Sequence, residues 1–219
     1  GGKQVVKEGI DQATDAAAIV ARGDSQVGSG LDVSIDNNTQ QSRQESIREK
    51  YSELSPEERR VLIEQKSETV AERWVRGYQD ELARSNPELN PHFVDKHAPD
   101  ILVEPNLKQR AIDGANPRKP DEPGIHPQPS SQFADWRTLM HILNEASTRS
   151  SRGLPEYNYF INNNPNKPAV VGYSDSVIGW GYSVNKSDLS NPHFHPEMYK
   201  WIVPLDNKTL LPYTAYPKR

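Results

Sequence analysis

The sequence has no cysteine among its 219 residues, and this absence removes several kinds of chemistry. Without thiols the chain forms no disulfide, has no thiolate nucleophile and offers no cysteine ligand to zinc. Packing and hydrogen bonds alone must hold the fold, in reducing and oxidising compartments alike. Such a chain suits a protein that crosses from one compartment to another.

Long apolar stretches are also missing. Only 34% of the residues are apolar, and no window approaches the roughly 20 consecutive apolar residues that a membrane-spanning helix needs. The opening segment, GGKQVVKEGID, lacks the apolar centre of a signal peptide. We therefore expect no membrane span, and a Gly-Gly start is consistent with a piece of a longer parent that carries its export signal elsewhere.

Charge is distributed unevenly along the chain. The net charge is −4, yet residues 94–219 carry 14 Lys and Arg against 13 Asp and Glu, which leaves 12 against 17 for the first 93 residues. All six histidines lie between His92 and His195. We therefore expect any active site in the second half, with local phosphate contacts rather than a broad basic face.

The first 90 residues are predicted to form a helical N-terminal region. Residues 3–22 have apolar side chains at helical spacing, whereas residues 23–41 mix Gly, Ser, Asp and Asn, so we predict a helix followed by a disordered linker. A second helix begins with Ser55 as N-cap, Pro56 and Glu58 in its first turn, and ends at Asn86-Pro87. We expect its apolar stripe to pack against the next domain rather than to bind a partner. The stripe consists of Val61, Leu62, Val70, Trp74, Tyr78 and Leu82.

Residues 91–219 are predicted to form a second domain, and the fold class is α+β. A short helix is expected over residues 106–113 with Gly114 as C-cap, and a longer helix is expected to begin at Ser130-Ser131. Beyond Gly153, short segments rich in Tyr, Val and Ile alternate with Asn, Pro and Gly, which is typical of antiparallel strands. The order predicts helices packed on a small antiparallel sheet.

Four short motifs follow one another in this second domain. They are VDKHAPDI around His97, LKQR ending at Arg110, SSQF at residues 130–133 and TAYP at residues 214–217, with the glycine-rich turn IGWGY before the last. In this order they resemble the C-terminal toxin domains of bacterial polymorphic toxins of the contact-dependent-inhibition and Rhs types, specifically the RNase A-like ribonuclease class. The chain departs from that class by following His97 with Ala-Pro-Asp, where the class has Val-Gly-Lys or similar. The related toxin nucleases grouped with barnase, EndoU and the tRNA-cutting colicins share the closing strand with a Thr, and the sequence leaves both groups open.

The resemblance implies a site that cleaves RNA without metal. Such cleavage needs a base for the 2′-hydroxyl, an acid for the leaving 5′-oxygen, and a cation or hydrogen-bond donors at the phosphorus. It makes His97 the acid/base group and Arg110 the cation at the phosphate. It makes Thr214 a donor to the scissile phosphate and Tyr216 a residue that positions His97 or the nucleobase. The residues expected to bind substrate are Ser130, Ser131 and Lys108.

The residue types alone leave plainer roles open. His97 is otherwise a surface or capping histidine, Arg110 a solvated helix residue, and Thr214 and Tyr216 ordinary strand residues. A second acid/base group is not obvious, because His141 on the helix after SSQF is better explained as structural. His193 and His195 alternate along an extended segment, a spacing by which two imidazoles can share zinc or serve as acid/base groups. Because Glu197 is the only close further ligand, we predict neither a metal nor a cofactor.

These inferences lead to one expected function and two alternatives. We expect a secreted antibacterial ribonuclease toxin that acts in the cytoplasm of a target cell. Its partners are expected to be an RNA substrate, with tRNA a candidate, a cognate immunity protein, and a secretion apparatus or parent toxin polypeptide. The alternatives are an ADP-ribosyltransferase toxin, for which no clear Glu-x-Glu pair is present, and a non-enzymatic adaptor whose N-terminal helices bind a secretion-apparatus protein.

Overall fold

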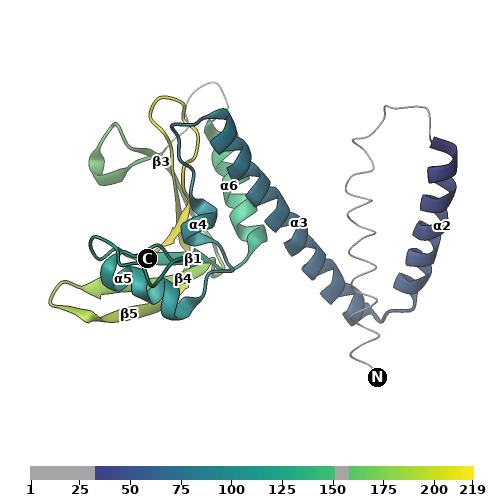
Figure 1. The fold of residues 1–219 in the computed structure, drawn as a ribbon, viewed down its shortest axis with the longest axis horizontal. Coiled ribbons are helices and arrows are strands. Elements are labelled where there is room, and N and C mark those ends of the chain that lie inside the picture. The colour runs from purple at the N-terminus through teal and green to yellow at the C-terminus, as the bar shows by residue number, and fades with distance from the viewer. Residues whose placement is uncertain (1–32, 151–157) are drawn as a thin grey trace. The chain divides into compact units, whose positions relative to one another are not determined.

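The computed structural model describes residues 33–150 and 158–219 (Figure 1). The chain divides into two compact units between Val70 and Ala71. The helix predicted for residues 3–22 lies outside the described residues. In chain order the elements are α2 (Val33–Ser52), α3 (Pro56–Ser85), α4 (Phe93–His97), the π-helix η1 (Val103–Leu107), α5 (Lys108–Asp113), β1 (Ser130–Phe133), α6 (Trp136–Ser150), β2 (Tyr159–Phe160), the 3-10 helix η2 (Ile161–Asn163), β3 (Pro168–Tyr173), β4 (Gly179–Asn185), β5 (Asp188–Met198), β6 (Lys200–Pro204) and β7 (Tyr216–Lys218).

Unit 1 contains α2 and the beginning of α3 in its described part. Residues 33–41, predicted as part of a linker, instead belong to α2. The Asp and Asn residues that suggested a linker, Asp36, Asn37 and Asn38, follow the first turn of this helix. The Gln, Arg, Glu and Lys residues that follow have good helix propensity, and this local preference favours the helix over a linker. The predicted start of α3 is confirmed, because the backbone N–H of Glu58 donates to Ser55 Oγ at 3.2 Å.

Unit 2 begins inside α3, at Ala71, and not at the predicted boundary of residue 91. Ala71, Val75 and Leu82 are buried in the main core, and Trp74 and Tyr78 pack against it. The apolar stripe that continues to Leu82 must be covered, so this half of the helix cannot be separated from the domain that covers it. The prediction that the stripe packs against the following domain is confirmed for Trp74, Tyr78 and Leu82.

The strands of unit 2 form two antiparallel sheets, which confirms the α+β class. One sheet has the order β1-β4-β5, and the other has the order β2-β3-β6-β7. Helix α6 packs against β1 and β6, and α5 packs against β1, β4 and β5 (Figure 1). Strands β1 and β7, one from each sheet, also contact each other. The sheets therefore meet where the segments SSQF and TAYP come together.

The SSQF segment forms strand β1, whereas we predicted that it opens a helix. Strand β1 pairs with β4, with Ser131 opposite Gly181. A Cβ at Gly181 would lie 2.0 Å from the carbonyl oxygen of Ser130, so the glycine permits this close pairing. The IGWGY stretch was described as a glycine-rich turn among the motifs, but it also belongs to the Tyr-, Val- and Ile-rich segments predicted as strands, and residues 179–182 of it begin β4. The helix begins later, at Trp136, where Asp135 Oδ1 accepts a hydrogen bond from the backbone N–H of Thr138 at 2.7 Å.

Candidate functional site

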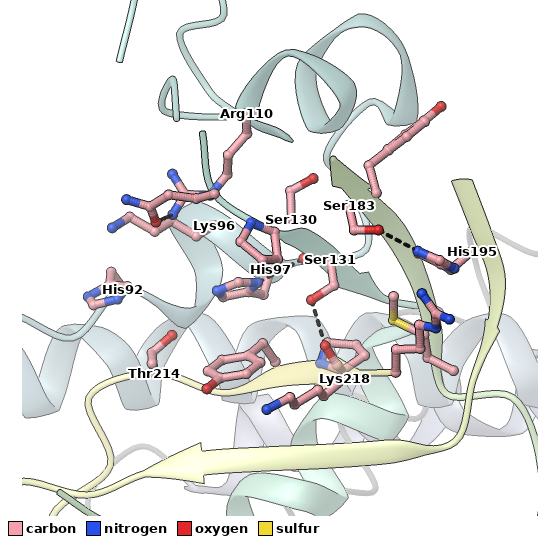
Figure 2. Close-up of a pocket in the computed structure, with 17 residues that line it drawn as sticks. His92, Lys96, His97, Arg110, Ser130, Ser131, Ser183, His195, Thr214 and Lys218 are labelled. Carbon is pink, nitrogen blue, oxygen red and sulfur yellow. Dashed lines mark hydrogen bonds between the residues drawn. The ribbon is translucent and has the colours of Figure 1, made fainter. Parts of the chain in front are cut away.

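A pocket of about 520 Å³ lies in unit 2, lined by residues from α4, α5, β1, β4, β5 and β7 and from the segments next to them (Figure 2). Small-molecule sites usually have volumes of roughly 300 to 1,000 Å³. The structure brings together six of the seven residues that the sequence singled out. Those that line the pocket are His97, Arg110, Ser130, Ser131, Thr214 and Tyr216.

His97 is the last residue of α4 and is only 7% exposed, so it is not the surface histidine considered above. Its Nδ1 lies 2.8 Å from the carbonyl oxygen of Ser131. Because a carbonyl accepts only, Nδ1 carries the proton and Nε2 is left as the acceptor of the neutral ring. The pKa of His97 is lowered to about 3, mainly by burial and also by the nearby charge of Arg110, against the opposing effect of the Ser131 carbonyl. The imidazole is therefore a neutral, oriented ring.

Arg110 lies on α5 and is also 7% exposed. One terminal nitrogen donates to the carbonyls of Gly114 and Ala115, both at 3.3 Å, and the other donates to Gln128 Oε1 at 3.0 Å. The remaining donor, Nε, is buried and has no partner, and no carboxylate in the described ranges pairs with this side chain. Burial lowers the pKa of Arg110. A buried cation without an anion is costly, so this arrangement favours binding of a negatively charged ligand.

The end of α5 supplies two of the acceptors that hold Arg110. Gly114 has a φ of 81°, the left-handed conformation that commonly ends a helix, which confirms its predicted role as C-cap. A Cβ there would lie 2.1 Å from the carbonyl oxygen of His126, so glycine is required for space as well as for conformation. The helix end thereby fixes the guanidinium from its own backbone.

Thr214 and Tyr216 enter the pocket from the end of the chain. Thr214 precedes β7 rather than lying within a strand as predicted; it is 5% exposed, and its Oγ1 is buried without a hydrogen-bond partner. The ring of Tyr216 lies 5.5 Å from that of His97, centroid to centroid. Burial raises the pKa of Tyr216 to about 12, so its phenol stays protonated. This contact agrees with the expected positioning of His97 by Tyr216.

Strand β1 connects the segments that carry these groups. Ser130 Oγ donates to the carbonyl of Leu107 at 2.6 Å, next to α5, and Ser131 Oγ donates to the carbonyl of Pro217 at 2.7 Å in β7. Gln132 Nε2 donates to the carbonyl of Ile101 at 2.9 Å, in the segment that follows α4. Since both serine hydroxyls already donate to the backbone, their part in substrate binding stays a prediction. Lys108 lies outside the pocket lining, with its Nζ 3.6 Å from Glu104.

The sequence analysis missed several lining residues, among them His92 and Lys96. Nδ1 of His92 lies 2.9 Å from the carbonyl oxygen of Asn90. Lys96 is half-buried on α4, and burial lowers its pKa, as does the charge of Arg110. The spacing of His92, the N-cap of α4, and Lys96 in that helix was a weak local signal, because it does not indicate the distant segments that complete the pocket.

The lining is strongly cationic for a chain with a net charge of −4. Lys96, Arg110, Lys218 and Arg219 line the pocket, whereas no Asp or Glu does so among the residues with a described position. A cavity that is lined by cationic side chains and by no carboxylate side chain has a positive potential. The arrangement therefore suits a phosphate or another anion.

The remaining histidines are placed differently. His195 lines the pocket at its β4–β5 end, with Nε2 2.7 Å from Ser183 Oγ, and the ring of His193 lies 4.7 Å from that of His195. His141 is exposed on α6 and is not part of the lining. Within the described part of the chain, no cluster of three or more His, Cys, Asp or Glu is arranged to hold a metal ion.

Comparison with protein families, with curated proteins and with solved structures finds no match for this chain. Across residues 33–150 and 158–219, every helix is too short or too polar to cross a membrane. The functional inference therefore depends on the residues of the pocket.

Proposed function

We propose that unit 2 is an endoribonuclease that cleaves RNA by metal-independent transesterification. One observation carries the proposal: a neutral histidine, a buried arginine without a carboxylate and a buried threonine hydroxyl without a partner line the same pocket. These groups are His97, Arg110 and Thr214. They are the base, the cation and the donor that attack of a 2′-hydroxyl on a phosphodiester requires.

The proposed reaction begins with His97. Nε2 takes the proton of the 2′-hydroxyl, O2′ forms a bond to phosphorus, and the bond from phosphorus to O5′ breaks. A second group gives a proton to O5′, so the products are a 2′,3′-cyclic phosphate and a 5′-hydroxyl. Arg110 and Thr214 donate hydrogen bonds to the non-bridging oxygens, whose negative charge grows in the transition state.

The pKa of His97 is too low for an effective base in the free protein, and bound substrate must raise it. At a pKa of about 3 the free ring is a weak base. The cations that hold the pKa of His97 down include Arg110 and Lys96, and a bound phosphodiester neutralises part of their charge. Substrate binding therefore raises the pKa of His97 and makes its Nε2 a stronger base.

The two alternative functions draw no support from the pocket. ADP-ribosyl transfer was expected to need a glutamate pair, and the described lining has no carboxylate side chain. The adaptor function concerns the N-terminal helices and stays a prediction. Secretion, the antibacterial target and the immunity partner likewise stay predictions that follow from the resemblance to polymorphic toxins.

The test is cleavage of RNA by the full chain. We expect fragments that end in a 2′,3′-cyclic phosphate, identified by mass spectrometry. His97→Gln should slow cleavage by about 10²- to 10⁴-fold, and Arg110→Met by about 10²- to 10³-fold. His141→Gln, on the exposed face of α6, is the control and should cleave at the wild-type rate. Intact RNA with the wild-type chain, or full activity in both pocket variants, would overturn the proposal.

A further inference from the structure

Two histidines, and not one, border the part of the pocket that holds Arg110. Figure 2 shows His92 and His97 on either side of the space between Lys96 and Thr214. We propose that His92 is the second acid/base group, the general acid that gives a proton to the leaving 5′-oxygen. This inference rests on the proposed ribonuclease function.

The two rings are oriented in the same way. In each, Nδ1 lies within hydrogen-bond distance of a backbone carbonyl, that of Asn90 for His92 at 2.9 Å and that of Ser131 for His97 at 2.8 Å. Among the described residues, neither ring has a hydrogen-bond partner at Nε2, so this nitrogen can face substrate. His92 is also fixed through its backbone, because its N–H donates to the carbonyl of Tyr213 at 2.9 Å, directly before Thr214.

The position of His92 agrees with the demands of an in-line displacement. The attacking O2′ and the leaving O5′ lie on opposite sides of phosphorus, so the base and the acid must also lie on opposite sides of it. Figure 2 shows Arg110 and Thr214 bordering the space between His92 and His97, so a phosphate that contacted both residues would lie between the two rings. His92 therefore lies on the side from which the leaving oxygen departs.

Charge around His92 links its protonation to substrate. The groups that act on it are Asp95 and Lys96 on α4 and Arg110 on α5, and the ring of Tyr213 packs beside it. Burial lowers the pKa of His92, and Lys96 and Arg110 lower it further, while the Asn90 carbonyl and Asp95 raise it. A phosphate anion next to the two cations opposes their effect and raises the pKa of His92. The substrate thus favours the protonated ring that a general acid requires.

His195 is placed less well for this role. Its Nε2 is 2.7 Å from Ser183 Oγ, so the nitrogen that would face substrate is already engaged. The charges that act on it are those of Arg219 and His193, not of Lys96 or Arg110. Figure 2 shows it with Ser183 on the strands, at the end of the pocket away from His92.

Rates on two substrates distinguish a residue that acts as general acid from one that acts as general base. One is a diribonucleotide, whose 5′-oxygen needs a proton to leave; the other is uridine 3′-(4-nitrophenyl phosphate), whose nitrophenolate leaves without one. In the full chain, His92→Gln should lower kcat on the dinucleotide by about 10²- to 10⁴-fold and on the aryl ester by less than about 10-fold. His97→Gln should slow both substrates, and His141→Gln neither.

The outcomes distinguish this inference from the ribonuclease proposal. Wild-type cleavage of both substrates with equal losses for His92→Gln, or with no loss on the dinucleotide, would overturn the role of His92 alone. Failure of the wild-type chain on both substrates would overturn the ribonuclease and the role of His92 together. His92→Asn, whose amide also donates to a carbonyl, should repeat the pattern, and thermal unfolding of both variants checks that the loss is not one of folding.

Discussion

Lowering the pH from 7 to 4 tests whether burial holds His97 neutral. The pKa of His97 is about 3 in the folded protein and 6.5 for the ordinary side chain. Between these values the unfolded chain binds a proton at this residue and the folded chain does not, so acid favours unfolding. The stability is fully present above pH 6.5 and is lost progressively down to about pH 3.

The size of the effect follows from the two pKa values. Their difference corresponds to about 5 kcal/mol of unfolding free energy over the whole range, and to about 3 kcal/mol between pH 7 and pH 4. Urea unfolding of the wild-type chain and of His97→Gln at both pH values measures it. The variant should lose about 3 kcal/mol less than the wild type on acidification. Because burial also lowers the pKa of His92 and His195, only the difference between the two proteins reports on His97.

The glutamine variant is suited to this comparison, since its amide can still donate to the Ser131 carbonyl but does not titrate. At pH 7 it should itself be less stable than the wild type, because a side chain that is 7% exposed packs on all sides. A wild-type chain and a variant that lose equal stability between pH 7 and pH 4 would show that the His97 ring is not buried and neutral. The role of His97 as a base would then fail with it.

Three further predictions concern other parts of the chain. Thr214→Val should leave the free energy of unfolding unchanged or raise it, because Oγ1 is buried without a partner. The same variant should slow RNA cleavage by about 10- to 100-fold. Normal cleavage would contradict a role for the hydroxyl. RNA cleavage should persist in EDTA, and a loss that zinc restores would indicate His193 and His195 as ligands. A chain that begins at Pro91 should not fold by circular dichroism, whereas one that begins at Pro56 should fold and cleave. The reason is that residues 71–85 of α3 belong to unit 2, and Ala71, Val75 and Leu82 are buried in its core. Cleavage by the shorter chain would contradict that assignment.

The last of these predictions follows from how α4 is attached. Gln79 on α3 accepts a hydrogen bond from the backbone N–H of Val94 at 2.8 Å and donates one to Asp95 Oδ2 at 3.0 Å. Removing α3 would release the short helix that ends at His97. Truncation at the boundary predicted at residue 91 would therefore remove the residue that holds α4 in place as well as part of the core.

Local patterns in the sequence were sufficient for some of these features. The capping residues Ser55 and Gly114 act within a few positions of themselves, and both were identified correctly. The α+β class also follows from local periodicity, because most of the helices of unit 2 precede its strands and, among the described elements, only β1 lies between two α-helices. The grouping of His97, Arg110 and Thr214 in one pocket depended on the order of the motifs rather than on any single motif.

Features that depend on distant segments could not be obtained in this way. The four residues of SSQF form a strand because β4 lies beside them, and nothing within the segment identifies that partner. The division between the two units falls inside α3, and its position depends on which surface covers Val75 and Leu82. The sequence analysis did not identify His92 as a site residue, because its role depends on neighbours on α5 and next to β7. These neighbours lie beside it only in the folded chain.

The position of Ser131 has a consequence for when the pocket forms during folding. Its carbonyl holds a ring 34 positions earlier in the chain, and its hydroxyl binds a carbonyl 86 positions later. Contacts with such separations require the closure of long loops, which slows folding. A chain that leaves a ribosome or a pore with its N-terminus first has no complete pocket until residues 214–217 have emerged. The pocket is therefore complete only after residues 214–217 have joined the segments that precede them in the chain.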